Sequence, residues 1–294
     1  MLTSLRIVAA RQAVATRVFS RGLSTVALEF SHNKAPPSSK PPLVILHGLF
    51  GSKQNWRAIA KKLSAQLGRD TYSVDLRNHG DSPHVAPHTY SAMSGDIVRF
   101  IEDHGLGRAV LVGHSMGGKV VMQTALEHPS LVDMLIVDDM VPAKAKLAHE
   151  FAEYVQMLKT IEDRGIASQK EADAMLETVE KDISVRQFLL TNMKKAREGE
   201  GKGTYKSRIP LELLGKSLEG VMEWDVDAAK QYQGPTLFIA GKRSPYIRPH
   251  AYPAMRQYFP NYEVEELDTG HWVHAEMPHE FIQLVEAFID KNEH

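Results

Sequence analysis

The stretch VLVGHSMGGKVVM, Val110–Met122, places a serine between glycines where an apolar run gives way to a helical pattern. Gly113 and Gly117 lie two residues before and two residues after Ser115. This Gly-x-Ser-x-Gly spacing between a strand and a helix is typical of the tight turn called the nucleophile elbow. Side chains at the glycine positions would collide in such a turn, which lifts the serine hydroxyl above the sheet. A serine here can also simply cap the helix. The strand and helix patterns on either side favour the elbow.

Around this turn, apolar strand-like runs alternate with helical patterns. This alternation predicts βαβ units and an α/β fold with a mostly parallel sheet covered by helices on both faces. Strands are expected over residues 43–48, 71–76, 109–115, 131–140, 235–241 and 261–268, and helices over 55–67, 94–105, 116–128 and 278–292. The helix over 94–105 is expected to begin near Ser94 or Asp96.

Two further segments interrupt the alternation. Residues 31–42 are rich in Pro and Ser, which predicts a loop. From about 143 to 233 the chain is mostly charged and helix-like, with one polar, flexible loop over 197–208. Because sheet strands flank this long segment, we interpret it as a helical cap inserted after the strand that follows the nucleophile helix, within one domain covering residues 25–294.

The first 24 residues are excluded from this domain. They contain Arg6, Arg11, Arg17 and Arg21, and no acidic residue precedes Glu29. An amphipathic, Arg-rich and acid-free terminus predicts a mitochondrial transit peptide and a location in the matrix. A disordered basic tail is the alternative.

The composition and charge of the chain argue against several classes of function. The 294-residue chain has a formal net charge of -1, so no overall field attracts nucleic acid. No apolar run reaches the roughly 18 residues needed to span a bilayer. The absence of cysteine excludes disulfides, thiol nucleophiles and thiolate metal sites.

A serine hydroxyl needs a base to take its proton, and the base of this fold is a late histidine. His271 follows Gly270 in the loop between the last predicted strand and the last helix. His274 is the rival, closer to the helix. His114 lies beside the serine but at a variable position of the elbow, so a packing or hydrogen-bonding role is expected for it.

The carboxylate that orients the base is expected at the end of the strand following the nucleophile helix. The loop after the cap, GKRSPYIRPH, contains no carboxylate. Asp138 and Asp139 end the earlier strand, and Asp139 is preferred because it lies nearer the sheet's exit. Asp138 is then structural, and Asp268 is a lesser rival.

Acyl transfer also needs N–H donors for the oxyanion. The backbone amide of Met116, the residue after the nucleophile, is one expected donor. HGLFG, residues 47–51, follows the first predicted strand and supplies the other. Leu49 is the first choice and Phe50 the alternative.

Together these residues resemble the α/β-hydrolase superfamily over nearly all of the chain after about Leu28. The motifs HGLFGSKQNW, DLRNHGDSPH, GHSMGGKV, IVDDMVP, VRQFLLTN and DTGHW look like the mitochondrial abhydrolase-domain subgroup of serine hydrolases, which includes fungal proteins related to ethanol acetyltransferases. In that subgroup the acid stands in a D-x-x-P setting, which Asp139 fits. The resemblance also implies that Asp75, Arg77 and His79 pin a structural turn near the active-site mouth.

The expected activity is hydrolysis of short-chain esters or thioesters by Ser115, Asp139 and His271 through an acyl-enzyme. Alcohol O-acetyltransfer from acetyl-CoA is the first alternative, and a non-catalytic role as a partner of mitochondrial enzymes is the second. No cofactor is expected, although a CoA thioester is a candidate substrate. No metal site is expected, because His79, His84 and His88 lie in a Pro-rich loop without ligand spacing.

Overall fold

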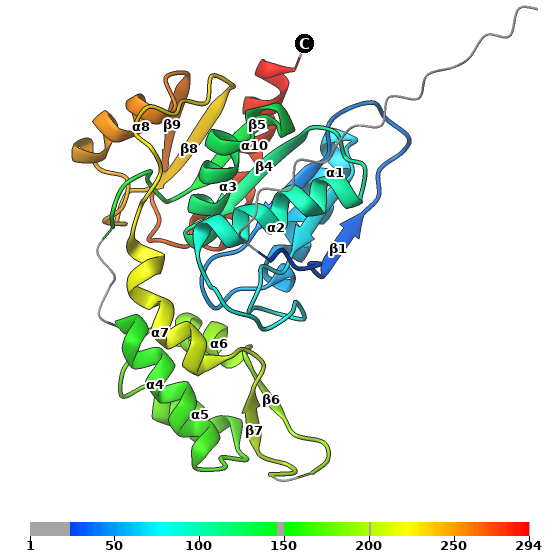
Figure 1. Cartoon of the computed structure of the whole chain (residues 1–294). Helices are drawn as coiled ribbons and strands as arrows, with labels where there is room; N and C mark the ends of the chain where they lie inside the picture. The colour runs from blue at the N-terminus through cyan, green and yellow to red at the C-terminus, as the bar shows by residue number, and fades with distance from the viewer. Residues whose placement is uncertain (1–23, 146–149, 200, 294) are drawn as a thin grey trace, which may run out of the picture.

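The central sheet carries the architecture of the protein. The computed structural model describes residues 24–145, 150–199 and 201–293, and within these residues the main sheet has seven strands (Figure 1). Their spatial order is β1-β3-β2-β4-β5-β8-β9. All neighbours pair in parallel except β1, which is antiparallel to β3 at one edge. The strands are β1 (Phe30–Asn33), β2 (Leu43–Leu46), β3 (Thr71–Val74), β4 (Ala109–His114), β5 (Val132–Asp138), β8 (Thr236–Gly241) and β9 (Tyr262–Leu267).

Helices cover both faces of the sheet, as the alternation predicted. Side chains of a strand point alternately to opposite faces, so Leu43 and Ile45 of β2 belong to one core cluster and Val44 and Leu46 to the other. The first cluster includes residues of α1 and α10, and the second includes residues of α2, α3 and α8. These helices are α1 (Arg57–Leu67), α2 (Tyr90–Asp103), α3 (Met116–Glu127), α8 (Tyr252–Tyr258) and α10 (Pro278–Asn292), with the short α9 (Val273–Glu276) before α10.

Between β5 and β8 the chain forms a separate group of elements at one end of the sheet (Figure 1). We call this group the cap. It contains α4 (Glu150–Asp163), α5 (Gln169–Leu176), α6 (Ile183–Leu190), the hairpin of β6 (Met193–Lys195) and β7 (Tyr205–Ser207), and α7 (Leu211–Met222).

Buried polar contacts join the cap to the sheet domain. The Lys119 ammonium on α3 donates to the carbonyl oxygens of Met222 and Glu223 at 2.9 and 3.0 Å, where α7 ends. The Asn192 side chain, after α6, donates to the Phe50 carbonyl at 2.8 Å. A cation at a helix C-terminus is favourable, so Lys119 attaches the end of α7 to α3, and Asn192 attaches the cap to the loop that follows β2.

Part of the predicted loop over 31–42 is wrong, because Phe30–Asn33 form strand β1. The stretch FSHN shows no apolar alternation, and it becomes a strand by pairing with β3, from Phe30 opposite Val74 to Asn33 opposite Thr71. The Phe30 ring packs 5.8 Å from Tyr72 and 5.3 Å from Phe100, centroid to centroid. This edge strand therefore forms because it pairs with β3, and not because of its own sequence pattern.

Two other local expectations also need correction. Helix α2 begins at Tyr90 rather than near Ser94 or Asp96, because the Thr89 side chain accepts a hydrogen bond from the Ala92 amide and caps the helix. Ser94 and Asp96 are buried inside the helix. In the cap, residues 205–207 of the predicted polar loop form strand β7, which pairs antiparallel with β6.

The predicted transit peptide falls almost wholly on residues 1–23, which lie outside the described residues. In the part of the chain that is described, no helix is both long enough and apolar enough to cross a membrane.

Candidate active site

Ser115 occupies a sharp turn between β4 and α3. Its backbone has φ 52° and ψ -115°, a conformation that side-chain-bearing residues rarely adopt. A Cβ atom at Gly113 would lie 2.3 Å from the Gly117 carbonyl oxygen, and a Cβ atom at Gly117 would lie 2.6 Å from the His47 carbonyl oxygen. Both glycines are therefore required by the tightness of the turn, as the spacing in the sequence predicted.

The structure brings Ser115, His271 and Asp139 together. His271 Nε2 lies 2.9 Å from Ser115 Oγ, and His271 Nδ1 lies 2.7 Å from Asp139 Oδ2. His271 belongs to the loop between β9 and α9, and Asp139 directly follows β5. A serine, an imidazole and a carboxylate in this order form the relay used for nucleophilic catalysis by serine.

Asp139 is held by donors from the last residue of β8 and from the loop that follows it. The Gly241 amide donates to Asp139 Oδ1 at 3.1 Å, and the Ser244 hydroxyl donates to Asp139 Oδ2. The residue has φ 49°, so the chain turns sharply as it leaves the sheet. These donors fix the carboxylate so that Oδ2 faces His271.

Ser244 and Tyr246 are site residues that the sequence reasoning did not identify. Tyr246 is buried, and its ring lies 4.6 Å from the His271 ring, centroid to centroid. The segment GKRSPYIRPH contains no carboxylate, but its Ser244 supplies a hydroxyl group to the acid that follows a different strand.

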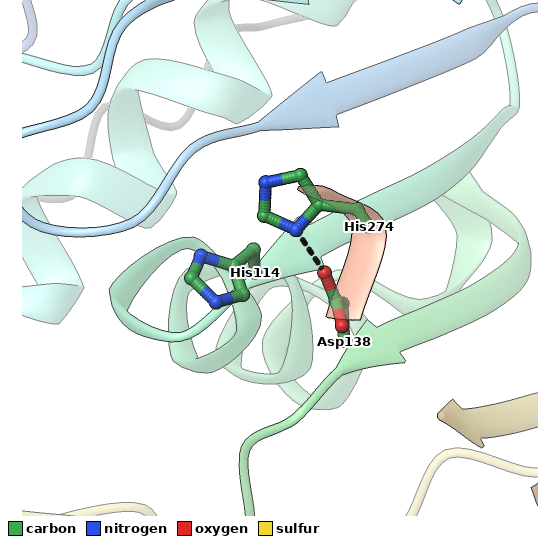
Figure 2. A group of neighbouring side chains, drawn as sticks. All are labelled: His114, Asp138 and His274. Atoms are coloured by element: carbon green, nitrogen blue, oxygen red, sulfur yellow. Dashed lines mark hydrogen bonds and ion pairs between the residues drawn. The ribbon is translucent and has the colours of Figure 1, made fainter. Parts of the chain in front are cut away.

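The other candidates for the base and the acid, His274, Asp138 and Asp268, lie outside the relay. Asp138 Oδ2 lies 2.6 Å from His274 Nδ1, so these two form a separate buried pair (Figure 2). Asp268 is 75% exposed at its side chain and pairs with Arg243. None of these three is bonded to Ser115 or His271 through its side chain.

His114 completes the buried group shown in Figure 2, together with Asp138 and His274. His114 Nε2–H donates to the His271 carbonyl oxygen at 2.9 Å, which is the hydrogen-bonding role expected for it. The His274 ring also stacks on Trp56, with centroids 4.1 Å apart. Each of these three residues is close in sequence to a member of the Ser115 relay, and the group supports the loop that carries His271.

Among the described residues, the same three form the group that could supply metal ligands, with candidate atoms within 4.8 Å of one another. Ligands of one tetrahedral zinc ion lie roughly 3.4 Å apart, given bonds of about 2.1 Å. The 2.6 Å between His274 Nδ1 and Asp138 Oδ2 is shorter than that. In this arrangement the two atoms share a proton.

The loop after β2 presents a free amide to the site. The Phe50 N–H donates to His79 Nε2 at 3.2 Å, so it is occupied. Among the described residues, no acceptor is hydrogen-bonded to the Leu49 amide, nor to the Met116 amide at the start of α3. Of the two candidates in this loop, Leu49 is therefore the residue with an N–H available for an oxyanion.

Two buried histidines fix the shape of this loop. His47 Nδ1–H donates to the Gly48 carbonyl at 2.8 Å, and its Nε2 accepts from the Leu76 amide at 3.0 Å. His79 Nδ1–H donates to the Arg77 carbonyl at 3.1 Å, leaving Nε2 to accept from Phe50. Both rings must be neutral, and burial lowers the pKa of His47 and lowers the pKa of His79 well below its usual range.

The residues expected to pin a turn near the site are buried and bonded. Asp75 accepts from the Lys53 and Asp81 amides at 2.6 and 2.9 Å. Arg77 donates to both oxygens of Asp96, at 2.6 and 2.7 Å. With His79 they form a polar support beneath the loop after β2.

These histidines predict an acid-sensitive fold. Burial lowers the pKa of His88 to about 4, whereas an unfolded histidine titrates near pH 6.5. The unfolded chain therefore binds protons first, so stability is fully present above about pH 6.5 and falls as the pH drops towards 4. His88 alone corresponds to a loss of about 3 kcal/mol across that window.

Urea unfolding at pH 7.5, 6.0 and 5.0 measures this loss. His88→Gln, which places a neutral amide group at this position, should make the loss of stability on acidification smaller. An unfolding free energy that is constant from pH 7.5 to 5.0 would contradict the buried neutral histidines.

Comparison with known proteins places the chain in a family. Residues 41–278 match the family model for the alpha/beta hydrolase fold. The chain is 39% identical over 268 residues to the probable alcohol acetyltransferase of Saccharomyces cerevisiae, covering 86% of this chain and 78% of that protein. It is 40% identical over 257 residues to the sn-1-specific diacylglycerol lipase ABHD11 of Danio rerio, covering 84% and 78%.

A solved structure agrees with these matches. A marine microorganism esterase superimposes with a TM-score of 0.82 at 32% identity, covering 90% of this chain and 100% of that one. The fold class expected from the sequence is confirmed, and so is the resemblance to the abhydrolase-domain subgroup. This chain belongs to the α/β-hydrolase family and is an enzyme of that fold.

Proposed function

We propose that the protein is a serine hydrolase that cleaves carboxylic esters or thioesters with Ser115, His271 and Asp139. The observation that supports it most directly is the continuous relay of 2.9 and 2.7 Å from the serine hydroxyl through the imidazole to the carboxylate. Asp139 accepts the Nδ1–H of His271, so the lone pair of Nε2 faces Ser115. The imidazole is then oriented to act as a general base.

The first step forms the acyl-enzyme. His271 Nε2 takes the Ser115 proton while Oγ bonds to the carbonyl carbon, whose oxygen becomes an oxyanion. The free amides of Leu49 and Met116 donate to that oxygen. Collapse of the intermediate breaks the bond to the leaving oxygen or sulfur, which takes the proton from His271.

The second step releases the acid. Water gives its proton to His271 and adds to the acyl carbon, and the amides again stabilise the oxyanion. Ser115 Oγ leaves and recovers its proton from His271, so the enzyme returns to its starting state. Asp139 stays ionised and stabilises the imidazolium in both steps.

A fluorophosphonate probe tests this function, because it reacts with an activated serine. We expect stoichiometric labelling of the folded protein at Ser115, located by peptide mass spectrometry, and no labelling of Ser115→Ala. Folded protein that remains unlabelled would instead support the role of a binding partner with an idle relay.

Transfer of the acyl group to an alcohol is the second candidate. It is favoured by the 39% identity to a protein named as a probable alcohol acetyltransferase. An alcohol would replace water in the second step, with the same residues in the same roles. Product analysis with acetyl-CoA and ethanol separates the two reactions, since hydrolysis yields acetate and transfer yields ethyl acetate.

A further inference from the structure

A chamber of about 470 Å³ lies beside Ser115, between the sheet domain and the cap. Its walls come from the loop after β2, from α6 of the cap and from the segment that follows His271. Neither the relay nor the oxyanion donors require a space of this size. We therefore ask which part of a substrate the chamber would bind.

The chamber adjoins the nucleophile. Leu49, Val185, Phe188 and Trp272 line it, and they also line a second, much smaller space of about 10 Å³ that Ser115 and His271 border. The Phe188 and Trp272 rings border both spaces, with their centroids 6.4 Å apart and their planes tilted by 59°. A chain lying in the chamber would thus reach the reacting centre between these two aromatic rings.

The two spaces differ greatly in size. The small space continues from Ser115 towards Phe50 and towards Phe151 and Tyr154 of α4. A volume of about 10 Å³ is about one water-sized probe. Only a short acyl group fits there without movement of the cap, so the larger part of a substrate must lie in the chamber.

The chamber has a buried inner wall, which includes three histidines besides its apolar side chains, and a polar rim. Trp56 and Val185 are buried in its walls, whereas Asn55, Asp182 and Glu276 are exposed. Among the described residues that line it, none is Lys or Arg. The wall that these described residues form offers no cationic side chain to an anionic group, so the chamber favours a neutral, apolar chain.

The position of the chamber identifies which half of an ester it holds. His271 must return its proton to the leaving oxygen, so the alcohol half departs past the segment that follows His271. Trp272, His274 and Ala275 of that segment line the chamber. We propose, on the basis of the function proposed above, that the chamber binds the apolar alcohol chain of a neutral short-acyl ester, such as an acetate of a medium-chain alcohol.

Ser184 and Ile183 offer a matched test on one helix. Both are exposed residues of α6, but Ser184 lines the chamber, whereas Ile183, which is 61% exposed, does not. Ser184→Phe fills the chamber from the cap side, and Ile183→Phe adds a ring on the solvent side. Ala275→Phe fills the chamber from the opposite wall and guards against a local folding defect in α6.

Octyl acetate and ethyl octanoate are isomers that carry the eight-carbon chain on opposite sides of the ester. We expect Ser184→Phe and Ala275→Phe to lower kcat/KM for octyl acetate at least tenfold. Ethyl acetate should change less than twofold, ethyl octanoate should be a much poorer substrate than octyl acetate for the unmodified protein, and Ile183→Phe should behave like the unmodified protein. Equal losses for both isomers, a loss confined to ethyl octanoate, or the same loss in Ile183→Phe would overturn the assignment.

Binding of 1-octanol separates failure of this inference from failure of the proposed function. Trp56 and Trp272 line the chamber, so their fluorescence reports occupancy without any reaction. In the Ser115→Ala background, we expect 1-octanol to bind and Ser184→Phe to raise its Kd at least tenfold. Unchanged binding overturns the chamber assignment, even where hydrolysis by Ser115 is demonstrated. Lost binding supports it, even where no ester is hydrolysed.

Discussion

Replacing Ser115 with alanine is expected to lower kcat for ester hydrolysis by at least about 10⁴-fold. In the proposed mechanism the hydroxyl oxygen attacks the ester carbon, and the amides of Leu49 and Met116 cannot form an acyl-enzyme without it. What remains should be the slow attack of water on a bound ester. KM should change only modestly. Initial rates on a soluble acetate ester, measured against buffer alone, give the ratio directly.

Alanine is the appropriate substitution because it preserves the backbone of the elbow. Ser115 has φ 52°, and alanine keeps the Cβ atom that makes this conformation costly, so strain is unchanged. The lost contact is the hydrogen bond between Ser115 Oγ and His271 Nε2. We therefore expect the free energy of unfolding to change by about 1 kcal/mol or less. A folded Ser115→Ala protein within tenfold of full activity would show that another group is the nucleophile.

The features that could be predicted best from the sequence are those that a short motif determines. Gly113, Ser115 and Gly117 indicate the elbow because steric collisions allow no other residues at the glycine positions. His271 could be chosen because its loop follows the last strand. The parallel sheet followed from buried strands separated by helices, and the comparisons confirm that fold.

Other features depend on contacts between distant segments and could not be predicted in this way. The choice between Leu49 and Phe50 required the bond from Phe50 to His79, 29 residues away. The pair of Asp138 and His274 joins segments 136 residues apart. Strand β1 has no apolar alternation and depends on pairing with β3. The assignment of Asp139 rested on a D-x-x-P resemblance, while the donors that hold it come from a loop about 100 residues later.

The acid assignment leads to the second large effect, an expected fall in kcat of about 10⁴-fold for Asp139→Asn. The carboxylate can only accept the Nδ1–H of His271, and this leaves the Nε2 lone pair directed at Ser115. An asparagine can instead present its NH₂ group to Nδ1, because the Gly241 N–H, which donates to Oδ1, holds the amide oxygen on the side away from His271. The Ser244 hydroxyl can then turn to accept from the NH₂ group. The proton of the neutral ring then moves to Nε2, where it prevents removal of the serine proton. The imidazolium also loses its counter-charge.

Asp268→Asn is the matched control for this prediction. It makes the same chemical change three residues before His271, at a carboxylate that is 75% exposed and paired with Arg243. We expect its kcat to remain within twofold of the unmodified enzyme. Asp139→Asn should keep the fold, because the amide is nearly isosteric with the carboxylate and its oxygen still accepts from Gly241. If Asp268→Asn loses more activity than Asp139→Asn, the acid has been assigned to the wrong strand. If both retain full activity, His271 needs no carboxylate to orient it.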